Sequence, residues 1–383
     1  MALLTTDGSK TLYTFFPEAV AGTPVAGAYQ TLRAKPGVKF DLNRSTFTSA
    51  ELRADRMEGS MSFGTKSGSA SIPVEWSYGS YDSLMEAVMG GTWTANVLNI
   101  GNTPRTFTFE ETATDIGITE QIIGVQFGGM SLSQKANGIA DGDITGIFRN
   151  THIAQTKGVN LAYDSVALTI TRATAGFITV DGFAVGDAIT AIGNADAGNN
   201  NTTPWVITTL TDTVMTFTTA AGIVTKTSAA GITINLATKA TSVVAASTVA
   251  PFDSFNGTVT EGGATIAHVT GWDLKVDQQV DPNFALGSDS AQSVSVGTIK
   301  VSGNMTVYYI DQALRKKFFN GTATSLSLVM GSVSATKAYT LDLGTVKYTS
   351  NTRNNDPMAR IESMAFTATY TAVDGTLKIT RTP

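Results

Sequence analysis

Cysteine is absent from the 383 residues of this sequence. Its absence excludes a disulfide framework, a thiolate zinc site and a cysteine nucleophile. Histidine occurs only at His152 and His268, and neither stands in a motif with an acidic or hydroxyl partner. The sequence also lacks the P-loop, nucleophile-elbow and zinc-protease motifs. It therefore predicts no enzyme, no metal site and no cofactor.

Charged residues are scarce and slightly acidic in balance. They make up 15% of the chain, against about 25% in ordinary soluble domains. The formal net charge is −5, so the chain is short of the clustered Lys and Arg that hold nucleic acid through its phosphates. Apolar residues, at 42%, suffice to fill cores. The small uncharged residues that replace charges suit surfaces that an assembly buries.

Long hydrophobic runs are missing as well. No stretch of about 18 apolar residues occurs, and the opening MALLTTDGSK has no basic segment followed by an apolar run. The sequence thus predicts neither a membrane span nor an export signal. Its length exceeds the roughly 250 to 300 residues at which single cores stop growing, which favours two or three domains.

The sequence is rich in alternating apolar and polar residues, a pattern typical of half-buried strands. In the first part of the chain the pattern occurs in GVKFDL (37–42), SIPVEW (71–76) and TFTFE (106–110). In the last part it occurs in GWDLKV (271–276), NMTVYY (304–309) and YTLDLG (339–344). The pattern predicts a mainly β protein.

Each of these two parts also contains one predicted short helix. YDSLMEAVMGGT (81–92) and IDQALRKKFFNGT (310–322) both have an Asp at the expected N-cap and end at glycine. A long polar segment precedes the helix in each part, at 43–68 and at 277–301. The repeated order of strand, polar loop, strand, helix and strand predicts an internal duplication.

The middle of the chain has a different composition. Residues 156–247 are rich in Thr, Ala, Val and Ile, and turn residues separate short β patterns there. This spacing is typical of an Ig-like sandwich. We therefore expect a first domain at 1–155, an inserted all-β domain at 156–247 and a second copy of the first domain at 248–383.

The most charged segment is ELRADRMEG (51–59), in the first long polar segment. It mixes both signs in Glu51, Arg53, Asp55, Arg56 and Glu58. A solvated loop would explain this composition. Docking between subunits is the alternative, because a charge pattern can set the register of two partners.

Taken together, these elements resemble the tail tube proteins of long, flexible-tailed bacteriophages. In residues 31–93 the family's E-[IL]-R-x-D-R element, here ELRADR (51–56), precedes its Y-D-x-L-x-E-A helix, here YDSLMEA (81–87). Residues 251–288, 297–331 and 339–382 are similar to the family's C-terminal half, and 172–201 to an inserted β domain. The resemblance covers most of the chain, and its specificity lies in the order of the elements.

The resemblance implies a structural virion protein that polymerises as stacked rings into a hollow tail tube through which DNA is ejected. It implies two tube-type β-sandwich domains, each with one short helix. Tubes of this class have six tube domains per ring, so two per chain imply three subunits with pseudo-sixfold symmetry. One tube domain per chain would instead imply six subunits.

The resemblance also implies partners and a location. The partners are further copies of this chain and the tape-measure, tail-terminator and tail-tip proteins of the virion. The location is the virion tail, assembled in the host cytoplasm, without contact to a membrane.

Two sets of residues are expected to act in assembly and DNA passage. Glu51, Arg53, Asp55, Arg56 and Glu58 form a candidate ring-stacking loop. The acidic residues expected to line the lumen are Asp41, Glu75, Asp273, Asp277 and Asp342. Since duplex DNA carries about one negative charge per 1.7 Å, an acidic or neutral wall lets it pass without specific binding.

A multi-domain β adhesin or carbohydrate-binding surface protein is the alternative function. Such a protein would gather aromatic side chains on one face of its loops. Here Trp76, Trp93, Trp205 and Trp272 are scattered along the chain. The tail tube interpretation is therefore the one that accounts for more of the sequence.

Overall fold

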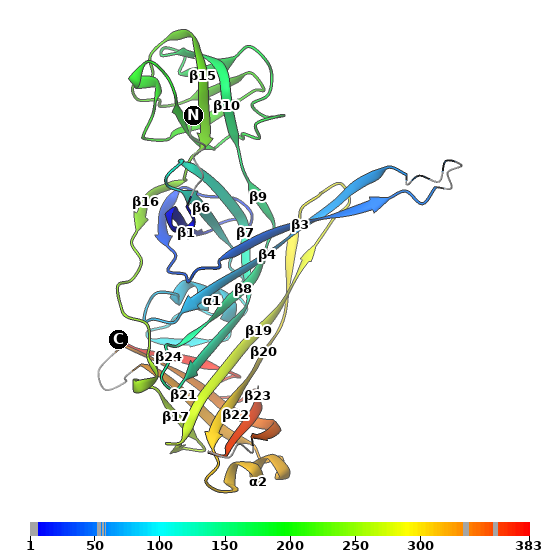
Figure 1. The fold of residues 1–383 in the computed structure, drawn as a ribbon, viewed down its shortest axis with the longest axis vertical. Coiled ribbons are helices and arrows are strands. Elements are labelled where there is room, and N and C mark those ends of the chain that lie inside the picture. Colours follow the sequence, from blue (N-terminus) through cyan, green and yellow to red (C-terminus); the bar gives the residue numbers. More distant parts are fainter. Residues whose placement is uncertain (1–6, 52–54, 56, 58, 332–336, 355–358) are drawn as a thin grey trace. The chain divides into compact units, whose positions relative to one another are not determined.

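The computed structural model describes residues 7–51, 55, 57, 59–331, 337–354 and 359–383. These residues form a mainly β protein with two α-helices, as the sequence predicts (Figure 1). The chain divides into two compact units. Unit 1 comprises Met1–Leu32, Phe107–Gly124 and Asn150–Ala245, and unit 2 comprises Arg33–Thr106, Val125–Arg149 and Ala246–Pro383. Unit 2 thus combines strands from both ends of the chain.

Unit 2 is built on an antiparallel sheet that we call the inner sheet. Its strands follow one another in the order β3 (Lys39–Thr48), β4 (Met61–Glu75), β8 (Asp141–Phe148), β7 (Ile118–Lys135, from residue 125), β19 (Val269–Asn283), β20 (Ser293–Tyr308), β23 (Ile361–Thr369) and β22 (Ala338–Asn354, from residue 345). The pairing of β7 with β19 joins the strands from the first part of the chain to those from the last part.

A second layer of unit 2 contains α1 (Asp82–Met89) and a smaller set of strands. These strands are β17 (Thr258–Glu261), β18 (Ala264–Thr265), β21 (Thr324–Gly331), the start of β22, β24 (Lys378–Thr382) and β5 (Val97–Asn99). Side chains such as Leu84 of α1 and Leu274 of the inner sheet are fully buried. The alternation that predicted the strands therefore reflects one buried face and one solvated face.

Unit 1 contains a small sheet and a barrel. The sheet holds β1 (Thr11–Pro17), β2 (Gly27–Thr31), β6 (Phe107–Ala113), β9 (Asn150–His152), β16 (Ala240–Val244) and the first residues of β7. The barrel closes in the order β10 (Gln155–Asp164), β11 (Thr169–Arg172), β14 (Val214–Phe217), β13 (Trp205–Leu210), β12 (Ala188–Ile192), β15 (Lys226–Leu236). The middle of the chain is all-β, as expected, and its closure is a feature that strand spacing alone does not specify.

The strand pairings of the first part recur in the last part. β1–β6 corresponds to β17–β21, β3–β4 to β19–β20, β4–β8 to β20–β23, β7–β8 to β22–β23 and β7–β9 to β22–β24. Even a register shift is shared, between Phe127 and Gly129 on β7 and between Tyr348 and Ser350 on β22. We call these two sets of elements, with α1 and α2 (Ala313–Asn320), the first and second copy. The predicted duplication is confirmed.

Strand register gives a residue-by-residue correspondence between the copies. Ile72 lies opposite Ile144 in the first copy, where Met305 lies opposite Met364 in the second. Continuing outward along the paired strands, Asp41 of β3 corresponds to Lys275 of β19. Ser131 of β7 corresponds in the same way to Thr352 of β22.

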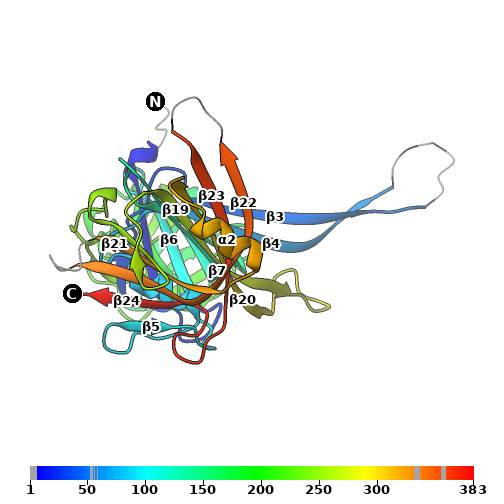
Figure 2. The same cartoon turned by 90° about the horizontal axis from the view of Figure 1, so that it is seen from below.

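The two helices share their ends and differ in burial. Both end at a left-handed glycine, Gly90 or Gly321, as predicted. Their N-caps are Tyr81 and Gln312, one residue before Asp82 and one after Asp311. Five residues of α1 are buried, whereas α2 has none and lies at the end of unit 2 that Figure 2 shows from below.

The two long polar segments are largely strands, where the sequence indicated loops. β3 continues to Thr48 and β4 begins at Met61, so most of 43–68 forms a β-hairpin (Figure 1). β19 and β20 likewise extend through most of 277–301. Backbone pairing holds these strands together without a buried apolar face, so the alternation that marks half-buried strands is weak there.

Tyr339 of β22 connects the second copy to the start of α1. Its hydroxyl donates to the carboxylate of Asp82 and accepts the Gly79 N–H at 2.9 Å. Arg381 of β24 also binds Asp82, at 2.5 Å. Burial, followed by the nearby charge of Asp82, raises the pKa of Tyr339, so the hydroxyl remains a hydrogen-bond donor at any ordinary pH.

We expect Tyr339→Phe to lower the free energy of unfolding of the isolated subunit by about 1–3 kcal/mol. The substitution keeps the ring but leaves the Gly79 N–H and one bond of Asp82 unsatisfied. Tyr308→Phe is the matched control, because that side chain is 46% exposed. Urea unfolding monitored by circular dichroism measures both changes. Equal stability of the two variants would contradict this account of Tyr339.

Candidate assembly surfaces

The polar face of the inner sheet brings together side chains from both copies. Glu75 lies opposite Asp141, which in turn lies opposite Ser133 of β7. Ser133 lies opposite Asp273 of β19. Laterally paired residues point to the same side of a sheet, so Glu75 and Asp273 share one face. A second row of pairs places Asp277 on that face too.

Both acidic and basic residues occur on this face. Its charged residues in the described strands are Asp41, Glu75, Asp141, Asp143, Asp273, Asp277, Asp281, Lys39, Lys135, Lys275, Lys300 and Lys347. Some of them pair, as Lys275 with Asp277 at 3.3 Å. The seven carboxylates only slightly outnumber the five lysines, so the face is weakly acidic and close to neutral.

The surroundings of Asp273 on this face change its pKa. Partial desolvation raises it, and the hydrogen bond from the Asn304 backbone and the charge of Lys135 oppose the shift.

Asp342 lies elsewhere in unit 2. It belongs to the start of β22, which pairs with β21 and β24 in the second layer. Its side chain accepts a hydrogen bond from Ser327 at 2.7 Å and lies 3.6 Å from Lys378. Four of the five carboxylates expected on the lumen wall thus share one face, and Asp342 is separate from them.

The edges of the inner sheet differ between the copies. β19 pairs on both sides, with β20 and with β7. Its counterpart β3 pairs with β4, and no second partner strand is described for it. The last residues of β22, the counterpart of the paired part of β7, likewise have one described partner strand, β23. Asp41 and Thr352, on these two edges, are exposed.

The hairpin of β3 and β4 carries the candidate stacking loop at its tip. Glu51 and Asp55 are described and exposed, whereas Arg53, Arg56 and Glu58 lie outside the described residues. The sequence reasoning missed the apolar side chains beside the tip. These are Phe47, Met57, Met61 and Phe63, with exposed fractions of 65%, 69%, 58% and 60%. Register places Phe47 on one face of the hairpin and Phe63 on the other, so both faces present apolar side chains. Exposed apolar side chains of this size along one arm indicate a contact surface.

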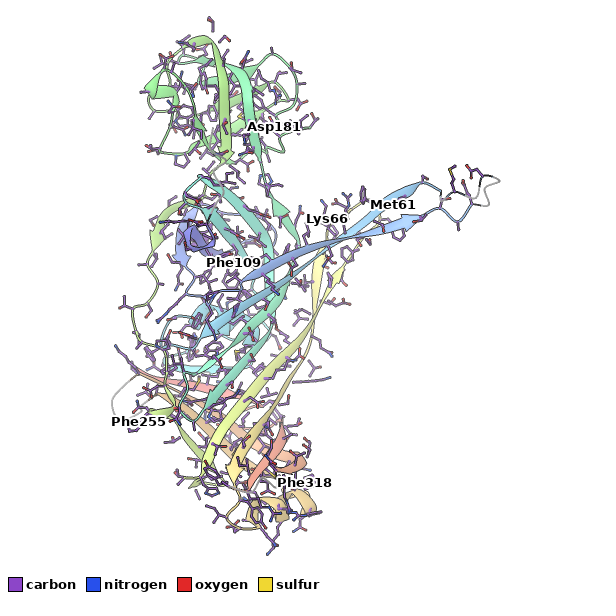
Figure 3. All side chains as sticks on the ribbon, in the orientation of Figure 1. Met61, Lys66, Phe109, Asp181, Phe255 and Phe318 are labelled. Atoms are coloured by element: carbon purple, nitrogen blue, oxygen red, sulfur yellow. The ribbon has the colours of Figure 1, made fainter. Side chains whose placement is uncertain are left out.

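A tie between two hairpins fixes the base of this arm. Lys66 of β4 lies 2.7 Å from Asp289, in the turn between β19 and β20, and its backbone N–H donates to the Asp289 carbonyl (Figure 3). The Lys66 ammonium holds the pKa of Asp289 below its usual value. The ion pair is therefore intact at neutral pH.

Groups that could perform chemistry are few. Within the described ranges no set of three His, Asp or Glu side chains could hold a metal ion. His152 pairs with Asp187 at 2.8 Å. Trp76, Trp205 and Trp272 are buried, so they do not form the aromatic face of a carbohydrate site. No helix in the described part of the chain is both long and apolar enough to cross a membrane.

Comparison with known proteins agrees with these surfaces. A family model described as phage tail tube protein matches the chain twice, at residues 8–241 and 206–372. No curated protein matches it. The two matches together cover nearly the whole chain. The chain therefore belongs to the phage tail tube protein family, whose members are structural proteins of the virion tail and not enzymes.

Proposed function

We propose that three copies of this chain close a ring, that the rings stack into the tail tube, and that DNA passes through the tube. The observation that carries the proposal is the pairing of β7 with β19, which joins a first copy to a second copy inside one chain. A ring that alternates the two copies needs the reverse junction between neighbouring chains. The counterpart edges, on β22 and β3, supply it.

Register specifies this junction in detail. Inside the chain, Lys275 lies opposite Ser131 and Asp277 opposite Gly129. Transferred to the counterpart strands, these pairs become Asp41 opposite Thr352 and Asn43 opposite Ser350 of the next chain. Pairing of this kind satisfies strand edges that would otherwise recruit unrelated chains.

The number of subunits follows from the duplication. The resemblance to tail tubes implies six tube domains in a ring, and this chain contributes two. Three chains then complete a ring through heterologous contacts, each copy meeting the other kind on both sides. Six chains would be required if only one copy took part.

We expect the Asp41→Cys, Thr352→Cys variant to form disulfides between neighbouring chains under mild oxidation. Directly opposite residues in an antiparallel pair have Cβ atoms about 4.5–5.5 Å apart, close enough for a small shift to form the bond. The chain has no other cysteine. A denaturing gel should show a ladder that ends at three subunits. A ladder that ends at six would contradict the trimeric ring.

The control pairs Asp41→Cys with Asn351→Cys. A shift of one residue along a strand moves the side chain to the other face of the sheet, so this variant should stay monomeric on the gel. Equal cross-linking of both variants would contradict the proposed register.

We also propose that the polar face of the inner sheet lines the lumen, with Asp41, Glu75, Asp273 and Asp277 on the wall. Asp342, on the second layer, is left out of this proposal. The near balance of carboxylates and lysines supports a wall that neither binds DNA tightly nor repels it strongly. Duplex DNA, with its dense negative charge, would otherwise adhere to a basic channel.

Tubes that carry Asp273→Lys and Asp277→Lys should retain a short fluorescent DNA duplex that wild-type tubes release. The retention should fall steeply with added salt, because counterion release drives it. Co-sedimentation of assembled tubes with the duplex measures the effect. The control, Asp273→Asn with Asp277→Asn, changes the charge half as far and should retain less. Equal retention by all three kinds of tube would place these residues away from the lumen.

Ring stacking is the proposed role of the hairpin formed by β3 and β4. Its exposed apolar residues would lie against the next ring, and Glu51 and Asp55 at the tip would set the register by charge. Arg53, Arg56 and Glu58 take part in this proposal on the strength of the sequence alone. The tie between Lys66 and Asp289 would keep the arm directed toward its partner.

We expect Phe47→Ser with Phe63→Ser to give rings that do not elongate into tubes. Both side chains are mostly exposed in the subunit, so the fold should tolerate their loss, while the apolar area buried between rings shrinks. Electron microscopy counts rings and tubes, and the melting temperature reports the fold. Val166→Ser, which removes an exposed apolar residue from the barrel unit, is the control and should leave tube length unchanged. Tubes of normal length from the Phe variant would refute the stacking role.

The remaining partners follow from this function. We propose that the finished tube encloses the tape-measure protein and meets the terminator and tip proteins at its two ends, all assembled in the host cytoplasm. The barrel of residues 155–236 would decorate the outside of the tube, since its own core is complete. Co-purification of tubes with these proteins from infected cells tests each contact.

A further inference from the structure

The second helix, α2, is covered only in part by its own chain. None of its residues is buried, and Phe319 is 68% exposed. Its counterpart α1 buries five residues in unit 2. Apart from this, the two helices match in length and in their glycine ends. An exposed helix with an exposed aromatic residue, in a fold whose other copy buries the same helix, indicates a missing partner.

The helices also differ in charge. α1 carries two acids, Asp82 and Glu86, and α2 carries three bases, Arg315, Lys316 and Lys317. Asp82 binds Arg381 of the second copy, as described above. Lys317 binds Glu261 at 2.6 Å, whereas no described residue forms an ion pair with Arg315 or Lys316. α2, whose Phe318 is labelled in Figure 3, therefore carries two positive charges that no ion pair with a described residue neutralises.

An acidic row lies at the corresponding place on the first copy. Tyr13 of β1 lies opposite Glu111 of β6. The hydroxyls of Thr112 and Thr119 form a hydrogen bond at 3.1 Å, so these two residues face each other on β6 and β7. The neighbouring pair is then Glu111 and Glu120 of β7. We call Tyr13, Glu111 and Glu120 the acidic row. By the correspondence between the copies, these three residues replace Val259, Leu328 and Leu341, which are all buried.

The acidic row holds two neighbouring carboxylates whose mutual repulsion a cation would relieve. Desolvation and the neighbouring charge of Glu111 raise the pKa of Glu120. Glu111 accepts a hydrogen bond from Tyr13 at 3.2 Å, and neither carboxylate forms an ion pair with a described residue. Two like charges on adjacent strands are unfavourable unless a cation approaches them.

We infer that α2 of one subunit docks on the acidic row of the next subunit, with Arg315 and Lys316 over Glu111 and Glu120. This inference rests on the ring proposed above. Its internal precedent is the contact of the α1 start with Tyr339 and Arg381 on the second copy. Register places Ile118, which is 37% exposed, where Tyr339 stands, so apolar contact accompanies the charge pairing.

The two junctions of the ring then have opposite polarity. Inside the chain an acidic helix meets a basic strand end, and between chains a basic helix meets an acidic row. A first copy facing another first copy would bring α1 against the acidic row, and a second copy facing another would bring α2 against Arg381. Like charges at an interface disfavour both arrangements. The polarity therefore specifies strict alternation of the copies.

The test introduces charge reversals into the Asp41→Cys, Thr352→Cys background, whose cross-linking reports ring closure independently of α2. Arg315→Glu with Lys316→Glu, and separately Glu111→Lys with Glu120→Lys, should each reduce the closed trimer by at least about tenfold, because each brings like charges together at the interface. The variant with all four reversals should recover most of the trimer. Lys157→Glu, an exposed change on the barrel, is the matched control.

The outcomes separate the inference from the ring itself. Failure of the parent cysteine variant to close would overturn the ring and the helix contact together. Closure of both the parent and the Arg315→Glu, Lys316→Glu variant in full yield would overturn the helix contact alone. Loss of the closed trimer in both double variants, without its recovery in the variant with all four reversals, would also contradict the helix contact. The Arg315→Glu, Lys316→Glu variant should fold even if the strand reversals unfold the subunit, because α2 has no buried residue. It therefore tests the helix contact by itself, and melting curves check the fold of each variant.

Discussion

The antiparallel pairing of β7 with β19 is the interaction on which the proposed assembly depends. It fuses four strands from each copy into one sheet through seven successive residue pairs. Backbone pairing of this kind is indifferent to side chains, so it fixes the spacing and tilt of the copies before any surface contact is considered. The same geometry, repeated between chains, would return to its start and leave no edge exposed.

Duplication kept the backbone of the tube domain and released its side chains to diverge. Strand pairings and even the register shift after Phe127 and Tyr348 persist in both copies. The side chains at corresponding positions have changed: Leu341, which is buried, stands in the second copy where the first copy has Glu120. A single-copy ring must use one surface for both of its junctions. Two copies in one chain can give each junction its own chemistry, and opposite charges are one way to keep them distinct.

The sequence predicted what depends on local periodicity. Alternation identified the strands, and Asp41, Glu75, Asp273 and Asp277, which the sequence marks as lumen candidates, share one face of the inner sheet; Lys275, between the last two, lies on the same face and was overlooked. Asp342 lies apart from these four because β22 passes from the second layer to the inner sheet along one strand, which alternation alone does not reveal. Asp82 looked like an N-cap, but Arg381, about 300 residues away, binds it. A contact between residues so far apart in the sequence produces no periodic pattern from which it could be predicted.

The position of the barrel explains how a tube domain tolerates an insertion of this size. Its first and last strands are neighbours, with Gln155 opposite Asn235 and their side chains bonded at 2.8 Å. The chain thus leaves and re-enters the small sheet of unit 1 at nearly the same point. There, buried Glu110 of β6 accepts the Lys239 N–H at 2.7 Å and the Thr238 hydroxyl, which holds the returning segment beside β2. An insertion whose ends meet adds little strain to its host, so the sheet can retain the register that the ring requires.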